Sequence, residues 1–205
     1  MKAELGALVF PAECPGCGAR AEPVCARCAA TLVDAPRAPT PFGVDDWVAA
    51  FAYQGVVREL VARLKYRNAR AALAWLAAAV ADVASTLDVT TAVVTWVPTT
   101  PARRRHRGFD HAELLARATA AQLGLPTRGL LHRLPGPPQT GRPRSERRPG
   151  PRFTPRGPLP TPGSVRSVLL IDDVSTTGAS LSGAAVALRV GGARYVRAAT
   201  VARTP

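Results

Sequence analysis

The sequence contains no stretch long and apolar enough to cross a membrane. Its longest apolar run, residues 71–84, is rich in alanine and is interrupted by Asp82, whereas a membrane-spanning helix needs about 18 or more apolar residues. The N-terminus, with Glu4 and Glu13 around a short apolar patch, lacks the basic segment followed by an apolar one that marks a signal peptide. These absences argue against membrane insertion and export, and they predict a cytoplasmic protein whose thiols stay reduced.

Lysine and aromatic residues are also scarce. Only two lysines, Lys2 and Lys65, occur among 27 basic residues, and aromatic residues make up 5% of the chain. The formal net charge of +13 indicates anionic partners, either phosphorylated metabolites or nucleic acid, although coding bias in a GC-rich genome would also raise the arginine content. Because few aromatic side chains are interleaved with the arginines, stacking on the bases of single-stranded DNA is weakly supported.

The cysteines form one compact pattern with none left over. They make two CxxC pairs separated by seven residues: Cys14, Cys17, Cys25 and Cys28. Two such turns can complete the tetrahedral four-sulfur shell of Zn²⁺. Two disulfides or an iron-sulfur cluster are the alternatives, and a reducing compartment favours zinc. Four protein ligands leave no open position for water or substrate, so we expect a structural metal site.

The length of 205 residues suits one full-sized hydrophobic core and a small appendage. We expect an N-terminal unit at residues 1–46, which comprises the zinc knuckle and a proline-rich linker from Ala29 to Asp46. The main domain is expected at residues 47–205.

Strand and helix patterns alternate along the main domain. The expected strands are Trp47–Tyr53, Thr91–Val97, Val168–Ile171 and Tyr195–Val201, and the expected helices span residues 57–64, 73–83, 112–123 and 178–190. This alternation predicts an α/β fold with a mainly parallel sheet and helices on both faces. Half of the chain's 20 prolines lie between Leu134 and Pro162, which predicts a long basic loop inside the domain, the kind of segment that often serves as an active-site lid.

The strand at Val168–Ile171 leads into a polar turn, Asp172-Asp173-Val174-Ser175-Thr176-Thr177-Gly178, and then into a helix. Ligands bind at the carboxyl ends of parallel strands, and the free N–H groups at a helix N-terminus attract anions. Adjacent carboxylates repel a bare phosphate but can accept hydrogen bonds from sugar hydroxyls. A ribose phosphate offers both groups. The alternative is a solvated turn in which Ser and Thr are only helix caps.

Two other phosphate-binding patterns are absent. There is no Walker A lysine motif and no G-x-G-x-x-G after a strand, so nucleoside triphosphates and dinucleotide cofactors are poorer candidates. The Asp-Asp turn instead resembles the phosphoribosyl pyrophosphate (PRPP) motif of type I phosphoribosyltransferases.

A second polar block follows the strand that ends at Val97. It reads Pro98-Thr-Thr-Pro-Ala-Arg-Arg-Arg-His-Arg-Gly-Phe-Asp-His-Ala-Glu-Leu-Leu115. Together with the cysteine knuckle and the Asp-Asp turn, it resembles the VP…R…RGFNQ…LA segment of the ComF (competence protein F) family. In this block Asp110 and His111 stand where the family usually has Asn and Gln. The resemblance also covers Lys65 in a K-Y-R segment, and Gln139, Glu146 and Arg147 in the basic loop.

The resemblance implies a type I phosphoribosyltransferase fold, PRPP with Mg²⁺ as ligand, and an association with DNA uptake in competent bacteria. As catalytic residues we select Asp172, Asp173, Arg103 and Arg107. The residues selected for substrate binding are Asp172, Asp173, Val174, Ser175, Thr176, Thr177, Gly178, Ala179, Ser180 and Lys65. A solvated basic loop for the arginines and a solvated helix end for Lys65 are the alternatives.

Two functions therefore compete, and a purely structural partner in a larger assembly is the third alternative. The first is transfer of a phosphoribosyl group from PRPP to an unidentified acceptor, in which Mg²⁺ and a guanidinium stabilise the charge on the departing diphosphate. The second is a non-catalytic module that handles single-stranded DNA, or contacts DNA-uptake proteins, on a phosphoribosyltransferase fold. Such a module would bind DNA with a steep salt dependence.

Overall fold

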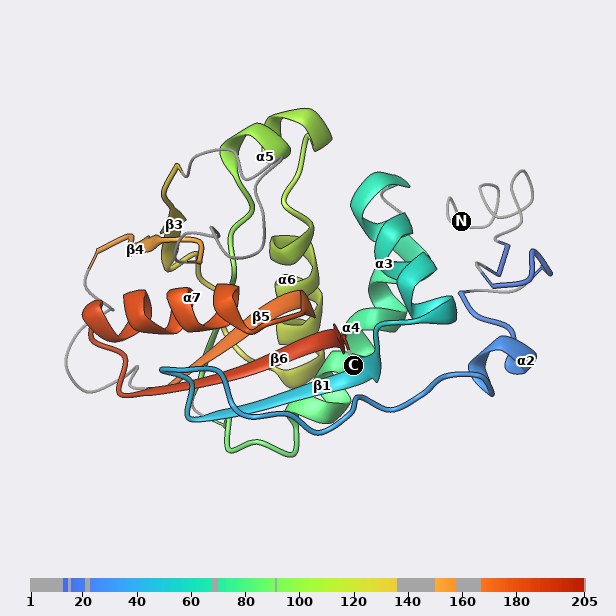
Figure 1. Cartoon of the computed structure of the whole chain (residues 1–205), viewed down its shortest axis with the longest axis horizontal. Helices are drawn as coiled ribbons and strands as arrows, with labels where there is room; N and C mark the ends of the chain where they lie inside the picture. The colour runs from blue at the N-terminus through green and yellow to red at the C-terminus, as the bar shows by residue number, and fades with distance from the viewer. Residues whose placement is uncertain are drawn as a thin grey trace.

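In the computed structural model of the chain, four strands form a parallel sheet in the order β1-β6-β5-β2 (Figure 1). The structure describes residues 13–14, 16–20, 23–67, 70–90, 92–135, 150–157 and 167–204. The strands of this sheet are β1 (Asp46–Ala52), β2 (Val93–Trp96), β5 (Ser167–Ser175) and β6 (Tyr195–Arg203). The helices are α2 (Ala26–Ala29), α3 (Gly55–Arg67), α4 (Arg70–Ala84), α5 (Pro101–Arg107), α6 (His111–Leu123) and α7 (Ala179–Val190), and a separate antiparallel pair joins β3 (Leu131–Arg133) to β4 (Phe153–Pro155).

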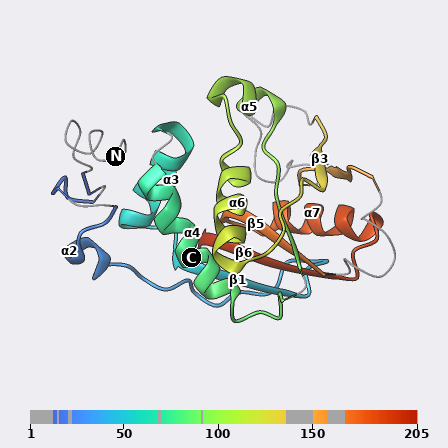
Figure 2. The same ribbon diagram turned by 180° about the vertical axis from the view of Figure 1, so that it is seen from behind.

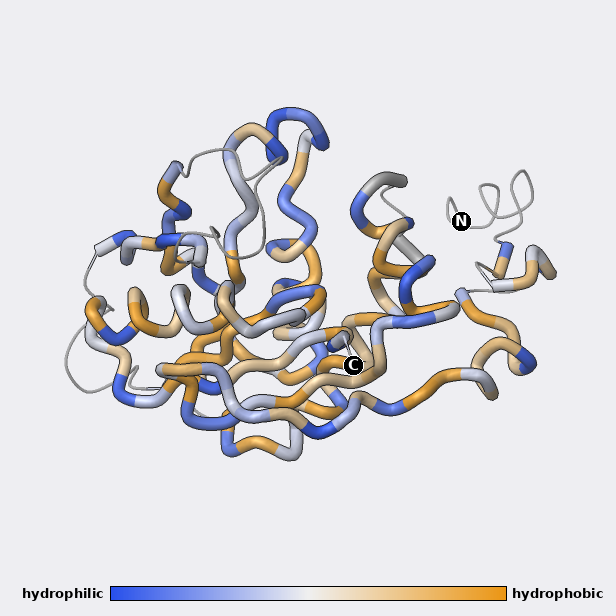
Figure 3. Tube along the Cα trace, in the orientation of Figure 1, coloured by the Kyte–Doolittle hydropathy of each residue, from blue (hydrophilic) through white to orange (hydrophobic). Residues whose placement is uncertain are grey.

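Strand β5 lies inside the sheet and contributes to a hydrophobic core on each face. Because side chains alternate along a strand, Leu169 and Ile171 pack into the core formed with α3, α4 and α6, whereas Val168 and Leu170 pack against α7 on the other face. Figure 3 shows hydrophobic residues gathered around the strands and the helices that cover them. A continuous apolar run is what a strand buried on both faces requires.

The expected α/β fold is confirmed, with a parallel sheet and helices on both faces. Each expected strand and helix of the main domain is present, with its ends shifted by a few residues. The largest shift is in β5, which continues through Asp172 to Ser175, so the polar turn is shorter than expected and comprises residues 176–178. Among the described residues, no helix is long and apolar enough to span a membrane.

Two predictions about the polar segments were incomplete. The arginine block contains a helix, α5, which begins after the N-cap Thr100 and ends at the left-handed Gly108; this helix stands away from the sheet in both ribbon views (Figures 1 and 2). The expected basic loop from Leu134 to Pro162 was wrong at residues 153–155, which form β4 and pair with β3. Gln139, Glu146 and Arg147 lie outside the described residues.

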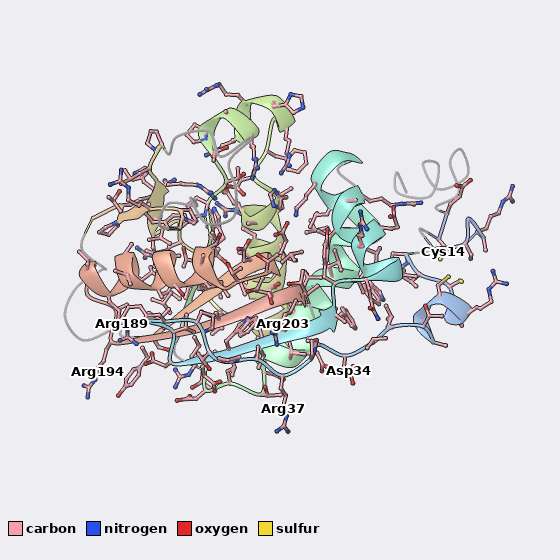
Figure 4. The ribbon with its side chains drawn as sticks, viewed as in Figure 1. Cys14, Asp34, Arg37, Arg189, Arg194 and Arg203 are labelled. Carbon is pink, nitrogen blue, oxygen red and sulfur yellow. The ribbon has the colours of Figure 1, made fainter. Side chains whose placement is uncertain are left out.

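The proline-rich segment before β1 lies along the edge of the sheet. Ala52 N donates to Val33 O at 2.8 Å, and Asp34 forms an antiparallel bridge with Phe51. Arg203 Nη1, on β6, donates to the carbonyls of Pro36 at 3.0 Å and Arg37 at 2.6 Å; Figure 4 labels Asp34, Arg37 and Arg203 along this edge. The segment thus covers part of the exposed edge of β1, which would otherwise offer unpaired backbone groups.

Candidate functional site

The two adjacent carboxylates at the end of β5 differ in their surroundings. Asp173 lies on the side of the strand that faces α3 and α6, where it contacts Lys65 and His111. Asp172 pairs in register with Thr200 of β6 and lines the cavities described below. Their position at the carboxyl end of a parallel strand is where ligands bind in sheets of this kind.

Asp173 is enclosed by donors. Its Oδ2 lies 2.6 Å from Lys65 Nζ and 2.9 Å from His111 Nε2, and its Oδ1 accepts from Val174 N at 2.7 Å. Burial alone would raise the pKa of Asp173, but the hydrogen bond from His111 and the charge of Lys65 outweigh it and hold the pKa below its usual range. Asp173 is therefore ionised in the folded chain.

Asp172 has the opposite electrostatic character. Burial, followed by repulsion from the Asp173 carboxylate, raises its pKa well above the usual range. Its Oδ1 accepts a hydrogen bond from Asp173 N at 2.9 Å. A carboxyl group that holds its proton can donate a hydrogen bond as well as accept one.

The start of α6 places His111 beside these carboxylates. Asp110 caps the helix, since its Oδ1 accepts from Ala112 N at 3.1 Å and its Oδ2 accepts from Thr99 N at 2.9 Å. His111 is the first residue of the helix, and its Nδ1 lies 3.1 Å from Arg107 Nη1. Asp110 thus has a structural role here, while His111 belongs to the site although it was not among the residues selected from the sequence.

A cavity of about 330 Å³ opens beside these residues. Four cationic side chains line it, Lys65 from α3, Arg103 and Arg107 from α5, and Arg133 from β3. Arg103 and Arg107 are four residues apart and therefore lie on one face of α5, whereas Arg104 and Arg105 do not line this cavity. The walls hold more positive than negative charge, so the cavity suits a ligand with several anionic groups.

Arg133 was missed from the sequence. Its Nη1 donates to Pro98 O at 3.4 Å, and its guanidinium lies over the Phe153 ring at 5.6 Å. Burial, and then repulsion from Arg103, lowers the pKa of Arg133, although an arginine remains charged. An anion bound between these two guanidinium groups would relieve their repulsion.

A smaller cavity of about 50 Å³ lies at the turn between β5 and α7. Its lining is Asp172, Val174, Ser175, Thr176, Thr177, Gly178, Ala179, Ser180 and Leu181. Gly178 adopts the left-handed conformation at φ 74° and, as the N-cap residue, has no side chain to cap α7. Ala179 N donates to Thr177 Oγ1 at 3.4 Å, and the N–H groups that follow in the first turn of α7 have no partner within the helix and suit an anion.

Ser175 adds an independent observation at this turn. The residue is 4% exposed, and its Oγ has no hydrogen-bond partner among the described residues. A buried hydroxyl without a partner is costly and is usually satisfied by a bound group. The two cavities share Asp172, Val174 and Ser180, so they adjoin.

The four cysteines form a separate cluster near the N-terminus. All four Sγ atoms lie within 4.8 Å of one another, and those of Cys17 and Cys25 are 3.5 Å apart. A tetrahedral shell with bonds of about 2.3 Å separates its sulfurs by about 3.8 Å, so these residues fit a Zn²⁺ ion. Figure 4 shows the sulfur atoms beside α2, at the end of the molecule away from α7.

The thiols also perturb one another. Hydrogen bonds from backbone N–H groups, chiefly that of Cys25, lower the pKa of Cys14 to about 6. The hydrogen bond with Cys14, together with burial, raises the pKa of Cys28 to about 12. Four sulfurs that compete for protons in this way form a site that a metal cation could occupy.

The cluster packs against α3. A Cβ on Gly16 would lie 2.7 Å from Val56 Cγ2 and 2.8 Å from Cys28 Sγ. Cys14 and Cys28 belong to the same hydrophobic core as Val56, and Arg63 Nη1 donates to Glu13 O at 2.9 Å. The cysteine unit therefore rests on the helix that also carries Lys65.

No protein-family model matches the chain, and no curated protein is similar to it. Among solved structures, the chain is similar to a purine phosphoribosyltransferase from Pyrococcus horikoshii Ot3, with a TM-score of 0.40 and 16% sequence identity over 65% of this chain and 83% of that chain.

Proposed function

We propose that this chain is a ComF-family phosphoribosyltransferase that binds PRPP, or a related ribose phosphate, together with Mg²⁺ in the cytoplasm. The observation that carries the proposal is the pair of adjoining cavities that share Asp172. One is small and lies at the N-terminus of α7, and the other is larger and lined by four cations. PRPP has two separate anionic groups joined by a ribose that carries hydroxyls.

The smaller cavity suits the 5′-phosphate. The N–H groups of α7, the hydroxyls of Thr176 and Thr177, and the unpartnered Ser175 Oγ can all donate to phosphate oxygens. The ribose hydroxyls would then meet Asp172, which borders both cavities. The diphosphate would reach Arg103, Arg107 and Arg133 in the larger cavity.

The reaction we propose forms a bond between the acceptor's nucleophilic atom and C1 of the ribose while the bond from C1 to the diphosphate oxygen breaks. The electron pair and the negative charge leave with diphosphate. The guanidinium groups of Arg103, Arg107 and Arg133 at the cavity wall stabilise this charge, and Mg²⁺ bound with the diphosphate would neutralise part of it. The proton of the acceptor leaves to solvent or to the diphosphate. Catalysis of this kind is electrostatic.

We further propose that residues 1–46 form a unit with a structural Zn²⁺ held by Cys14, Cys17, Cys25 and Cys28, and that residues 47–205 form the phosphoribosyltransferase-like domain. The geometry of the cysteine cluster supports the first assignment.

Isothermal calorimetry with PRPP and Mg²⁺ tests the proposal. We expect micromolar binding by the unaltered chain, a loss of at least about tenfold for Asp172→Asn and for Arg103→Ala, and little change for Arg105→Ala. Arg105 is the matched control because it is exposed on the same helix and does not line the cavity. Equal binding by Asp172→Asn and the unaltered chain would refute the site, and no binding by the unaltered chain would refute the function.

One feature favours the second candidate function, a DNA-handling module that acts in DNA uptake. Arg104, Arg105 and His106 are exposed on α5 and line neither cavity, so they are accessible to a nucleic acid backbone. Binding of single-stranded DNA that weakens steeply with salt, and is lost in Arg104→Ala/Arg105→Ala, would support this function. If no binding of single-stranded DNA is detected at low salt, the DNA-handling function is refuted.

A further inference from the structure

Four polar side chains from four elements make one continuous row beside the larger cavity. Arg107 Nη1 of α5 lies 3.1 Å from His111 Nδ1 of α6, and His111 Nε2 lies 2.9 Å from Asp173 Oδ2 of β5. Lys65 Nζ of α3 contacts the same oxygen at 2.6 Å. The side chains of Asp173, His111 and Lys65 are 8%, 9% and 22% exposed, so the row is mostly shielded from water.

Arg107 on one side of the His111 imidazole and Asp173 on the other determine which ring nitrogen carries the proton. A guanidinium has only donors, so the nitrogen that faces Arg107 must be the unprotonated one and must accept. The proton of His111 is then on Nε2, which lies 2.9 Å from Asp173 Oδ2. A second proton on the ring would aim a donor at the guanidinium and break this contact, because two donors and two positive charges would meet.

We propose that His111 is a positioning residue that, as the neutral Nε2–H tautomer, links Arg107 to Asp173 and so holds the Arg107 guanidinium at the wall of the anion-binding cavity. The inference rests on the proposed function only for the nature of the anion. It also divides the roles of the two carboxylates. Both oxygens of Asp173 have close contacts, Oδ2 with Lys65 and His111 and Oδ1 with Val174 N. Asp173 therefore holds cations at the wall of the larger cavity, which it also lines, while Asp172 borders both cavities.

Several other charged groups surround the larger cavity, but they do not replace Asp173 as the acidic partner of His111. Lys65 from α3 and Asp172 from β5 line the same cavity, as do Arg103 of α5 and Arg133 of β3. Asp110, next to His111 in the chain, directs its carboxylate oxygens to backbone N–H groups. Within this set, Asp173 is the acid in contact with the imidazole.

Two substitutions separate hydrogen bonding from packing. Glutamine has one amide donor group and one carbonyl acceptor, so His111→Gln can keep both contacts, whereas His111→Leu has similar bulk and keeps neither. With PRPP and Mg²⁺ in calorimetry, we expect His111→Leu to lose about tenfold or more in affinity and His111→Gln to stay within about threefold of the unaltered chain. In an Arg107→Ala background, His111→Leu should cause little further loss of PRPP affinity, because the two residues act as a unit. Equal affinity in His111→Leu and the unaltered chain, or a full loss in the Arg107→Ala background, would overturn the inference.

Nitrogen-15 NMR of the imidazoles tests the link without any ligand. The chain has three histidines, and the signal lost in His111→Gln identifies His111. We expect the Nε2–H tautomer at neutral pH, with the preference weakened in Arg107→Ala and in Asp173→Asn. A doubly protonated ring or the Nδ1–H tautomer would refute the proposal. If PRPP fails to bind while the Nε2–H tautomer depends on Arg107 and Asp173, the proposed function is wrong and the link stands.

Discussion

The Lys65 ammonium nitrogen lies 2.6 Å from Asp173 Oδ2, and this ion pair ties the end of α3 to the carboxyl end of β5. The other end of the same helix carries Val56, which packs with Cys14 and Cys28 in one core. A single helix therefore connects the cysteine cluster to the candidate site. Changes at either end of α3 should be detectable at the other.

Removal of the Lys65 ammonium should destabilise the fold. Lys65→Met keeps the length of the side chain but removes the ammonium group. The buried Asp173 carboxylate then keeps His111 as its side-chain partner. Because Lys65 is partly exposed, we expect a loss of about 1–2 kcal/mol in the free energy of unfolding, less than for a fully buried pair. Denaturant unfolding of Lys65→Met, Asp173→Asn and the double variant gives the coupling energy, and strict additivity of the two single effects would contradict the pairing.

The two carboxylates should have opposite effects on stability as the pH changes. The pKa of Asp172 is raised in the folded chain, so the unfolded chain releases this proton first, and the folded state loses stability as the pH rises from about 4 through the folded pKa. Asp172→Asn removes that loss, and its Oδ1 can still accept from Asp173 N. We expect Asp172→Asn to be more stable than the unaltered chain by about 1 kcal/mol at pH 7 and to show a smaller gain near pH 4.

Asp173→Asn is the matched control for this prediction. The pKa of Asp173 is lowered in the folded chain, so its carboxylate contributes stability above about pH 4 that is lost as the pH falls through the folded pKa. Asp173→Asn should therefore be less stable than the unaltered chain at pH 7. Denaturant unfolding at pH 5, 6 and 7 checks both variants, and a loss of stability in Asp172→Asn across this range would refute the assignment.

The features that were predictable from the sequence are those with a strong local pattern. The run Val168–Ile171 is apolar at every position, because β5 is buried on both faces, and such a run has few other interpretations. The Asp-Asp turn comes directly after this run. Once the run is assigned as a strand, the turn must lie at the carboxyl end of that strand. The four cysteines lie within one short segment, residues 14–28, and the geometry of two CxxC turns brings their sulfurs together.

The features that were missed depend on contacts between distant segments. Helix α5 buries no residue, so it has no apolar periodicity, although Thr100, Pro101 and Gly108 are typical start and stop signals. Arg133 reaches the cavity because β3 pairs with a strand 20 residues further along the chain. His111 and Arg107 are four residues apart, but Gly108 interrupts the helix between them, so their contact does not follow from helical spacing.

Loss of one cysteine should abolish metal binding and loosen α3. We expect about one Zn²⁺ ion per chain in the purified protein and substantially less in Cys17→Ser, because three thiolates do not complete the four-ligand shell. Ala26→Ser is the control, since Ala26 is exposed between the cysteines. Elemental analysis measures the metal. Hydrogen exchange should show faster exchange of the α3 amides in Cys17→Ser, since the cysteine unit packs on Val56; full zinc content in that variant would contradict the four-cysteine site.

Substitution of Gly178 should be costly for two separable reasons. Gly178 has a φ of 74°, which an L-residue adopts with strain, and a Cβ at this position would lie 3.1 Å from Pro41 Cγ and 3.2 Å from Pro41 Cβ. Gly108 has a nearly identical φ of 78°, and a Cβ there would meet nothing within 4 Å. Gly108→Ala thus isolates the strain, which we expect to cost about 1 kcal/mol of unfolding free energy.

Gly178→Ala should cost about 2 kcal/mol, because the strain is joined by crowding against Pro41. Pro41 belongs to the segment that precedes β1, so the extra cost measures how firmly this segment is held against the turn between β5 and α7. Denaturant unfolding of Gly178→Ala and Gly108→Ala measures the extra loss of unfolding free energy that is due to crowding against Pro41. Equal losses in Gly178→Ala and Gly108→Ala would mean that Pro41 moves aside freely, and the contact between the segment and the turn would then contribute nothing to the shape of the smaller cavity.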